Sequence, residues 1–147
     1  MKRVHSLPER GAVLVELAIV LPLLALLLLA VIDLGIVIRE HQILQNAARE
    51  GARFSSLPKN WISPINPGAS EALIKQRVVD YLAQENITVN AADITIDQLY
   101  PIPVGGLTLR GSRVTVTYNR PLLFAGAPLL PFAQVTLAGQ SVFRNLY

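Results

Sequence analysis

The first third of the chain is dominated by one apolar run. Between Ala12 and Ile38 the only charged residues are Glu16 and Asp33, and none lies between Leu17 and Ile32. A helix over this run would extend about 40 Å at ~1.5 Å per residue, whereas a hydrocarbon core is about 30 Å thick. The pattern therefore predicts a helix that crosses a membrane once.

Beyond the run, the pattern becomes that of an amphipathic helix. Good helix formers dominate residues 39–53, and apolar positions recur there at helical spacing: Ile43, Leu44, Ala47 and Ala48. We expect one helix over residues 12–54 that leaves the membrane near Arg39. Its amphipathic part is expected to pack either on the domain that follows or on another subunit.

A loop over residues 55–70 is predicted by three prolines, two asparagines and a glycine. Trp61 in this loop either anchors at the membrane interface or covers the core of the following domain. Ser70 is a candidate N-cap for a helix over residues 71–84, which has an apolar stripe.

After this second helix, apolar residues alternate with polar ones, as in β-strands. The alternation covers residues 87–89, 93–99 and 112–118, and a last strand is expected at 134–144. Residues 101–106 contain two prolines and two glycines and are expected to form a turn, while Gly139 is a candidate bulge. Residues 71–147 are therefore expected to form a small α+β domain, with one helix packed on a three- to four-stranded antiparallel sheet.

Residues 121–132 are apolar but contain three prolines, which argues against a second span and against a regular strand. Two interpretations remain open for this segment. It is either a buried crossover on the sheet or an exposed patch that contacts another subunit or the membrane.

The hydrophobic residues and the net charge are concentrated at the N-terminal end of the chain. Of the 147 residues 52% are hydrophobic, yet the excess lies in the N-terminal run. The net charge is +3, and the first ten residues supply +2 of it. The remaining +1 predicts no basic face, so we expect no nucleic-acid partner.

The residue types of common catalytic and metal sites are missing or scattered. The absence of cysteine excludes disulfides, a thiol nucleophile and thiolate metal ligands. His5 and His41 are far apart in the sequence, and Asp93 and Asp97 are expected to face solvent. No phosphate-binding loop or nucleophile motif is present, so we predict no enzyme, no cofactor, no metal and no small-molecule substrate.

The basic charges on the two sides of the span are nearly balanced, so they only weakly indicate its direction. Three basic side chains precede the span and three follow it, and the closer packing of the first set moderately favours a cytoplasmic N-terminus. The run is also longer than the apolar core of a cleavable secretory signal and lacks a convincing small-residue cleavage site, which favours a retained span. Asp33, near the far end, is expected to reach the headgroups.

Glu16 is the acid that needs explanation, because a carboxylate inside the apolar run costs free energy on insertion. It lies one helical turn after Ala12. Two interpretations are balanced: a boundary glutamate in the first turn of a helix, or a carboxylate that pairs with an amine created at Ala12 by cleavage after Gly11.

A family resemblance bears on this choice. A short basic leader ending in Arg10-Gly11, followed by AVLVE, resembles the class III signal of type IV pilin-like proteins. The segments LAIVLPLL (17–24), VIDLG (31–35) and LQNAAREGAR (44–53) are similar to the TadE-like family of the tight-adherence (Tad, or Flp) pilus machinery, and residues 114–124 and 135–144 are more weakly similar. An alanine after the cleavage point and an early proline fit this family better than the major type IV pilins.

The resemblance implies a processing site and a topology. Residues 1–11 would be a prepilin-type leader, cut after Gly11 by a prepilin peptidase, with Ala12 as the new N-terminus and Glu16 as the acid for processing or assembly. The chain would be a single-pass protein of the bacterial inner membrane, with its N-terminus cytoplasmic and its C-terminal domain periplasmic or extracellular.

The implied function is that of a minor pilin or pseudopilin that supports pilus biogenesis and surface adhesion. Its partners would be the peptidase, other pilin or pseudopilin subunits, Tad assembly proteins and the membrane. The sequence leaves open whether the product enters the fibre, lies at its tip or stays in the membrane as an assembly factor. The alternative is an unprocessed, single-pass periplasmic binding or scaffold domain.

Overall fold

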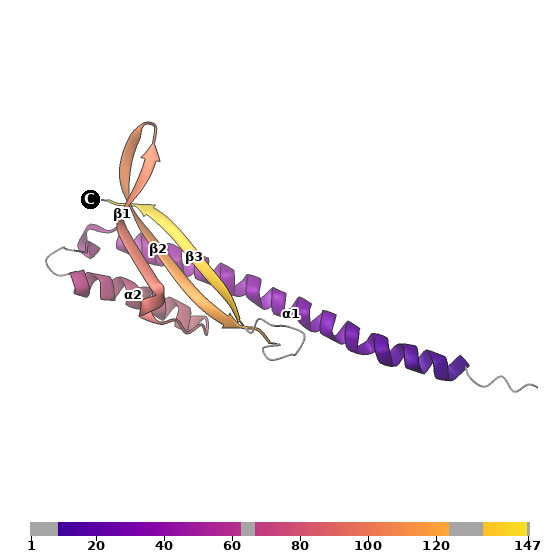
Figure 1. The fold of residues 1–147 in the computed structure, drawn as a ribbon. Helices are drawn as coiled ribbons and strands as arrows, with labels where there is room; N and C mark the ends of the chain where they lie inside the picture. Colours follow the sequence, from indigo (N-terminus) through magenta and orange to yellow (C-terminus); the bar gives the residue numbers. More distant parts are fainter. Residues whose placement is uncertain (1–8, 63–66, 124–133, 147) are drawn as a thin grey trace, which may run out of the picture. The chain divides into compact units, whose positions relative to one another are not determined.

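The computed structural model describes residues 9–62, 67–123 and 134–146. Its elements follow in the order α1 (Glu9–Ser55), η1 (Pro58–Asn60), α2 (Pro67–Gln84), η2 (Ala91–Asp93), β1 (Ile94–Val104), β2 (Leu107–Pro121) and β3 (Gln134–Arg144), as Figure 1 shows. The chain divides into two compact units, one ending at Ile36 and one beginning at Val37. The predicted α+β class, with a long N-terminal helix followed by a helix and an antiparallel sheet, is confirmed.

Helix α1 belongs to both units. It is one continuous helix that contains Pro22, and its residues from Val37 onward form part of the second unit. There the small side chains of Ala47, Ala48 and Ala52 are fully buried, which lets the helix approach the rest of the domain closely. The amphipathic part therefore packs on its own domain.

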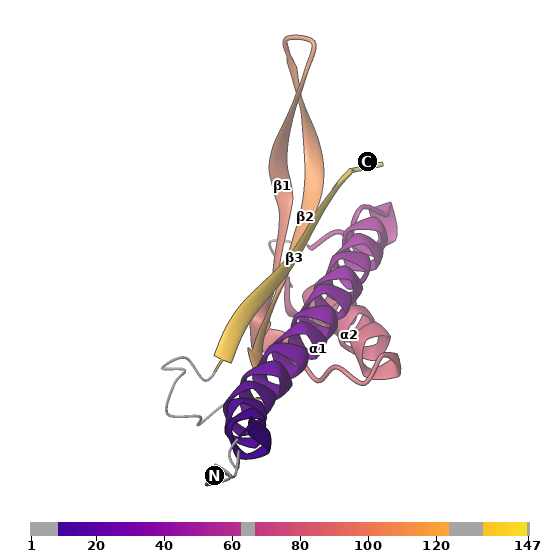
Figure 2. The same cartoon turned by 90° about the vertical axis from the view of Figure 1, so that its right-hand side faces the viewer.

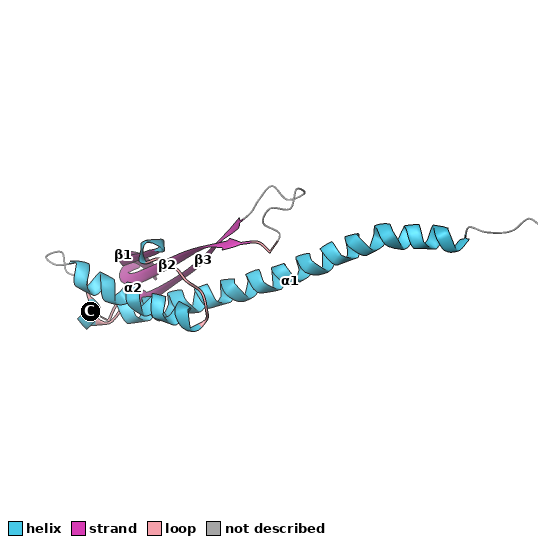
Figure 3. Ribbon diagram, turned by 90° about the horizontal axis from the view of Figure 1, so that it is seen from below, coloured by secondary structure: helices cyan, strands magenta, loops and turns pink. Residues whose placement is uncertain are grey.

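The three strands form an antiparallel sheet in the order β1-β2-β3. Within the second unit, α1 and α2 lie on the same side of this sheet (Figures 2 and 3). The inward side chains of β2 alternate with the outward ones, so that Val114 and Val116 are fully buried while Arg113 and Thr115 are only partly so.

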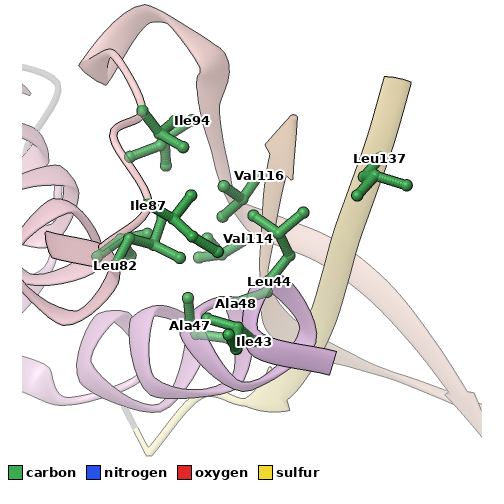
Figure 4. Packing of buried hydrophobic residues seen from close by; sticks show 13 residues of the cluster. Ile43, Leu44, Ala47, Ala48, Leu82, Ile87, Ile94, Val114, Val116 and Leu137 are labelled. Carbon is green, nitrogen blue, oxygen red and sulfur yellow. The ribbon is translucent and has the colours of Figure 1, made fainter. Parts of the chain in front are cut away.

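The core of the second unit is a set of aliphatic side chains contributed by both helices, the sheet and the segment before β1 (Figure 4). Leu44 of α1, Leu82 of α2 and Val116 of β2 are at its centre. Gly51 of α1 makes room for α2, because a Cβ there would lie 2.5 Å from Cγ2 of Val78.

The turn between β1 and β2 is shorter than the sequence predicted. Only Gly105 and Gly106 form it, with φ of +54° and +86°, as the tight hairpin turn requires. Pro101 and Pro103 lie inside β1 and not in the turn. This placement is tolerated because β1 is an edge strand, where a missing N–H breaks no ladder on its open side.

The strand expected at residues 87–89 is not formed, although Ile87 and Val89 are buried. The reason is the end of α2. Asn86 has a φ of +60°, and its N–H and that of Ile87 donate to the carbonyls of Ala83 (3.1 Å) and Leu82 (2.9 Å). This is the hydrogen-bond pattern of a helix C-cap, and it takes up the donor that a strand would need.

The bulge expected at Gly139 is also absent, since β3 pairs with β2 without a shift and Gly139 lies opposite Val116. A Cβ on Gly139 would instead run into the carbonyl group of Leu44 and come within 2.8 Å of the Gln45 nitrogen. The glycine therefore allows α1 to lie directly against β3. A bulge does occur in β1, between Asp97 and Tyr100.

The start of α2 also differs from the prediction, and one predicted segment is only partly described. Helix α2 begins at Pro67, so Ser70 lies inside the helix and is not its N-cap; proline is favourable in the first turn because that turn needs no N–H there. The two interpretations of residues 121–132 concern a segment of which 124–132 lie outside the described residues.

Candidate functional site

The first unit presents an apolar helix surface that no other described residue covers. Between Val13 and Leu34 nearly every large aliphatic side chain is exposed, and the part of α1 from Gly11 onward is long and apolar enough to cross a membrane. In water such a surface would be strongly unfavourable. A membrane or other apolar helices would therefore have to cover it.

Glu16 is an exception on this surface. Its side chain is exposed and makes no ion pair with any residue that the structure describes. It lies four residues after Ala12 in α1, on the same helix face, with Val13 and Val20 as apolar neighbours at helical spacing. The carboxylate is thus free to meet a positive charge from outside the described part of the chain.

Asp33, the other acid of the run, has a different environment. Its side chain is only 6% exposed, although Ile32 and Leu34 beside it are 47% and 59% exposed. The expectation that Asp33 reaches the headgroups of a membrane stays a prediction. Glu16 is the exposed acid of the run.

The predicted processing site lies at the start of α1. The helix begins at Glu9, so the bond between Gly11 and Ala12 is in its first turn. Apart from the neighbouring residues of the helix, no described atom lies within 4 Å of where a Gly11 Cβ would be. The structure therefore leaves this bond uncovered by the rest of the described chain.

Residues 11–53 match the model of the TadE-like protein family. This segment is TadE-like. It begins at Gly11, includes Ala12 and Glu16, and continues through the part of α1 that packs in the domain core. No curated protein and no solved structure gives a significant match.

The TadE-like segment ends beside a buried polar network that was not predicted from the sequence. Gln98 of β1 is 6% exposed, and its Nε2 donates to the Ser55 carbonyl (3.0 Å), the Ser55 hydroxyl (2.8 Å) and the Asn60 carbonyl (2.9 Å). The Ser55 and Ser112 hydroxyls are 2.6 Å apart. One amide thus satisfies the end of α1 and joins it to the sheet.

The same network reaches the end of the sheet. Asn145 donates from its Nδ2 to the Gln98 carbonyl (2.8 Å), and the N–H of Ile62 donates to Gln98 Oε1 (2.7 Å). A sequence signal was available, because residues 94, 96 and 98 alternate on one face and the first of them is an apolar core residue.

Trp61 lies beside this network and is partly buried. It lines a pocket with Ile62 and residues 96–99 of β1. Of its two predicted roles, the structure favours covering this end of the domain.

An ion pair joins α1 to β2 at the other end of the second unit. Glu40 of α1 and Arg120 of β2 form an ion pair of 2.8 Å, with side chains 18% and 6% exposed. No group of three or more His, Cys, Asp or Glu side chains that could hold a metal occurs among the described residues. The polar groups described here connect elements of the fold to one another.

Proposed function

We propose that the protein is a minor pilin or pseudopilin of a tight-adherence (Tad, or Flp) pilus, which acts in assembly and surface adhesion and not in catalysis. The observation that carries the proposal is the TadE-like match over a helix whose apolar side chains are uncovered and whose Glu16 is unpaired among the described residues. The apolar part of α1 would hold the chain in the inner membrane, with the N-terminus in the cytoplasm and the second unit outside.

Processing after Gly11 would create a positive charge with which the Glu16 carboxylate can pair. The N–H groups in the first turn of a helix have no intrahelical acceptor, and glycine costs about 1 kcal/mol relative to alanine in a helix interior. The first turn of α1, which contains Gly11, would therefore open at low cost to admit a prepilin peptidase.

After cleavage, the new Ala12 amine and the Glu16 carboxylate would be one helical turn apart. In an apolar surrounding, each charge is expensive alone and is stabilised by an opposite charge nearby. The carboxylate can pair with its own amine or with that of a neighbouring subunit, and the second arrangement would set the register between packed helices.

The decisive experiment measures the intact mass of the membrane-extracted protein, with and without co-expressed prepilin peptidase. We expect the peptidase to remove the mass of residues 1–11. An unchanged mass in both preparations would overturn the processing step and favour the unprocessed, membrane-anchored scaffold.

The role of Glu16 is tested separately by Glu16→Gln and Glu16→Ala, with Asp80→Asn as a control because Asp80 is an exposed acid on α2. We expect both Glu16 variants to lose cleavage or filament incorporation and the control to retain both. Normal cleavage and normal incorporation of the two Glu16 variants would show that Glu16 has no role in processing or assembly.

A further inference from the structure

The hairpin formed by β1 and β2 has an apolar face that no described element covers. Ile102 lies opposite Leu109, and Val104 lies opposite Leu107, so these four side chains share one face of the ribbon. Val104 is 50% exposed and Leu107 is 71% exposed. The hairpin projects beyond the helices of its unit (Figures 1 and 2).

The tip of this hairpin carries no charge. The nine residues 101–109, PIPVGGLTL, contain Thr108 as their only polar side chain. Pro101 and Pro103 also remove two backbone donors from β1, which makes this edge of the ribbon a poor template for an added strand. Contact through the apolar side chains is a mode of recognition that the hairpin offers.

Four exposed cations lie on segments that meet near the base of the hairpin, and we call them the basic collar: Arg53, Lys59, Arg110 and Arg144. Hydrogen bonds join their segments, because the N–H of Asn145 donates to the Arg110 carbonyl (3.0 Å) and that of Leu146 to the Ser56 carbonyl (3.2 Å). The collar is thus assembled from the end of α1, from η1, from β2 and from the end of β3.

The positive charge of the basic collar is not neutralised within the described part of the chain. None of its four side chains forms an ion pair there, and residues 51–62, 98–112 and 141–146 contain no acid. Nearby acids are already paired, as with Glu50 and Arg77 (2.9 Å) and with Asp97 and Arg113 (3.4 Å).

We propose that the hairpin and the basic collar together dock on an anionic lipid bilayer, with the apolar tip inserted and the collar on the phosphates. Arg110 follows Leu107 by three residues, about 10 Å of strand, which agrees with the ~5–10 Å depth of interfacial insertion. An uncharged convex tip with unpaired cations behind it complements the layered chemistry of such a bilayer.

Docking does not depend on cleavage after Gly11, so it stands or fails independently of the processing proposal.

The test uses the full chain held in nanodiscs of phosphatidylcholine, mixed with separate vesicles and analysed by flotation. We expect the discs to float with vesicles containing phosphatidylglycerol and not with pure phosphatidylcholine vesicles. Equal flotation with both, or with neither, would overturn the proposal, as would disc-to-disc association without vesicles, which would indicate a protein partner.

Variants separate the two parts of the surface. Arg110→Gln and Arg144→Gln should each lower vesicle partitioning about fivefold, and Leu107→Asp should lower it at least tenfold. Arg39→Gln and Leu73→Asp are matched controls, since both residues are exposed outside the hairpin and collar, and they should bind as wild type. Loss of binding in the controls, or none in the three variants, contradicts the assignment.

Discussion

The contact between α1 and β3 at Gly139 gives the sharpest prediction, namely that Gly139→Ala destabilises the second unit. An alanine in a strand is normally favoured over glycine by about 0.5–1 kcal/mol. Here the added Cβ would meet the Leu44 carbonyl group and the Gln45 nitrogen, which are backbone atoms and cannot move unless the helix leaves the strand. Overpacking costs about 1–3 kcal/mol, and a backbone contact belongs at the upper end of that range.

A loss of about 3 kcal/mol corresponds to a fall in melting temperature of at least ~10 °C for a domain of this size. Thermal unfolding of the detergent-solubilised chain, followed by near-ultraviolet circular dichroism, measures it. Gly35→Ala is the control, because no described atom apart from the neighbouring residues of the helix lies within 4 Å of its Cβ position. Adding Leu44→Ala should not rescue Gly139→Ala, since the contact is with backbone; an unchanged melting temperature for Gly139→Ala would refute the reasoning.

Three other substitutions test separate features. Glu40→Ala removes one member of the largely buried ion pair with Arg120 and should cost at least about 1 kcal/mol in denaturant unfolding, whereas an unchanged free energy of unfolding would show the pair to be dispensable. Gln98→Ala leaves acceptors such as the Ser55 carbonyl unsatisfied and should cost about 3 kcal/mol and raise amide exchange at residues 55–62; unchanged exchange would argue against the network. Asn86→Ala should destabilise by about 1 kcal/mol because of its φ of +60°, while Asn86→Gly should not, and equal stability of the two would contradict the C-cap.

Periodicity in the sequence was sufficient to predict the helices and most of the sheet. The apolar run and the spacing of Leu44 and Ala48 predicted α1, and alternation at Val114 and Val116 predicted β2. These signals are local, because they arise from which face of an element is buried.

The features that sequence reasoning missed depend on contacts between distant segments. A glycine inside a strand is typical of a bulge, and only the close approach of Gly139 to Leu44 explains why glycine stands here. Pro101 predicts a turn unless its strand is known to lie at the edge of the sheet. The amide of Gln98 finds its acceptors on Ser55 and Asn60, which belong to other elements, and the proposed processing site at Gly11 rests on family resemblance and on no contact.

The junction of α1 with β3 also has a consequence for the order of biogenesis. The core joins residue 44 to residue 139, and the polar network joins residue 55 to residue 112 and residue 98 to residue 145. Contacts so far apart in sequence form late, because long loops must close first. Until β3 has been made, the nascent chain would lack the contacts at Gly139 and Asn145, so that in the proposed topology the second unit completes its packing only after β3 has crossed the membrane.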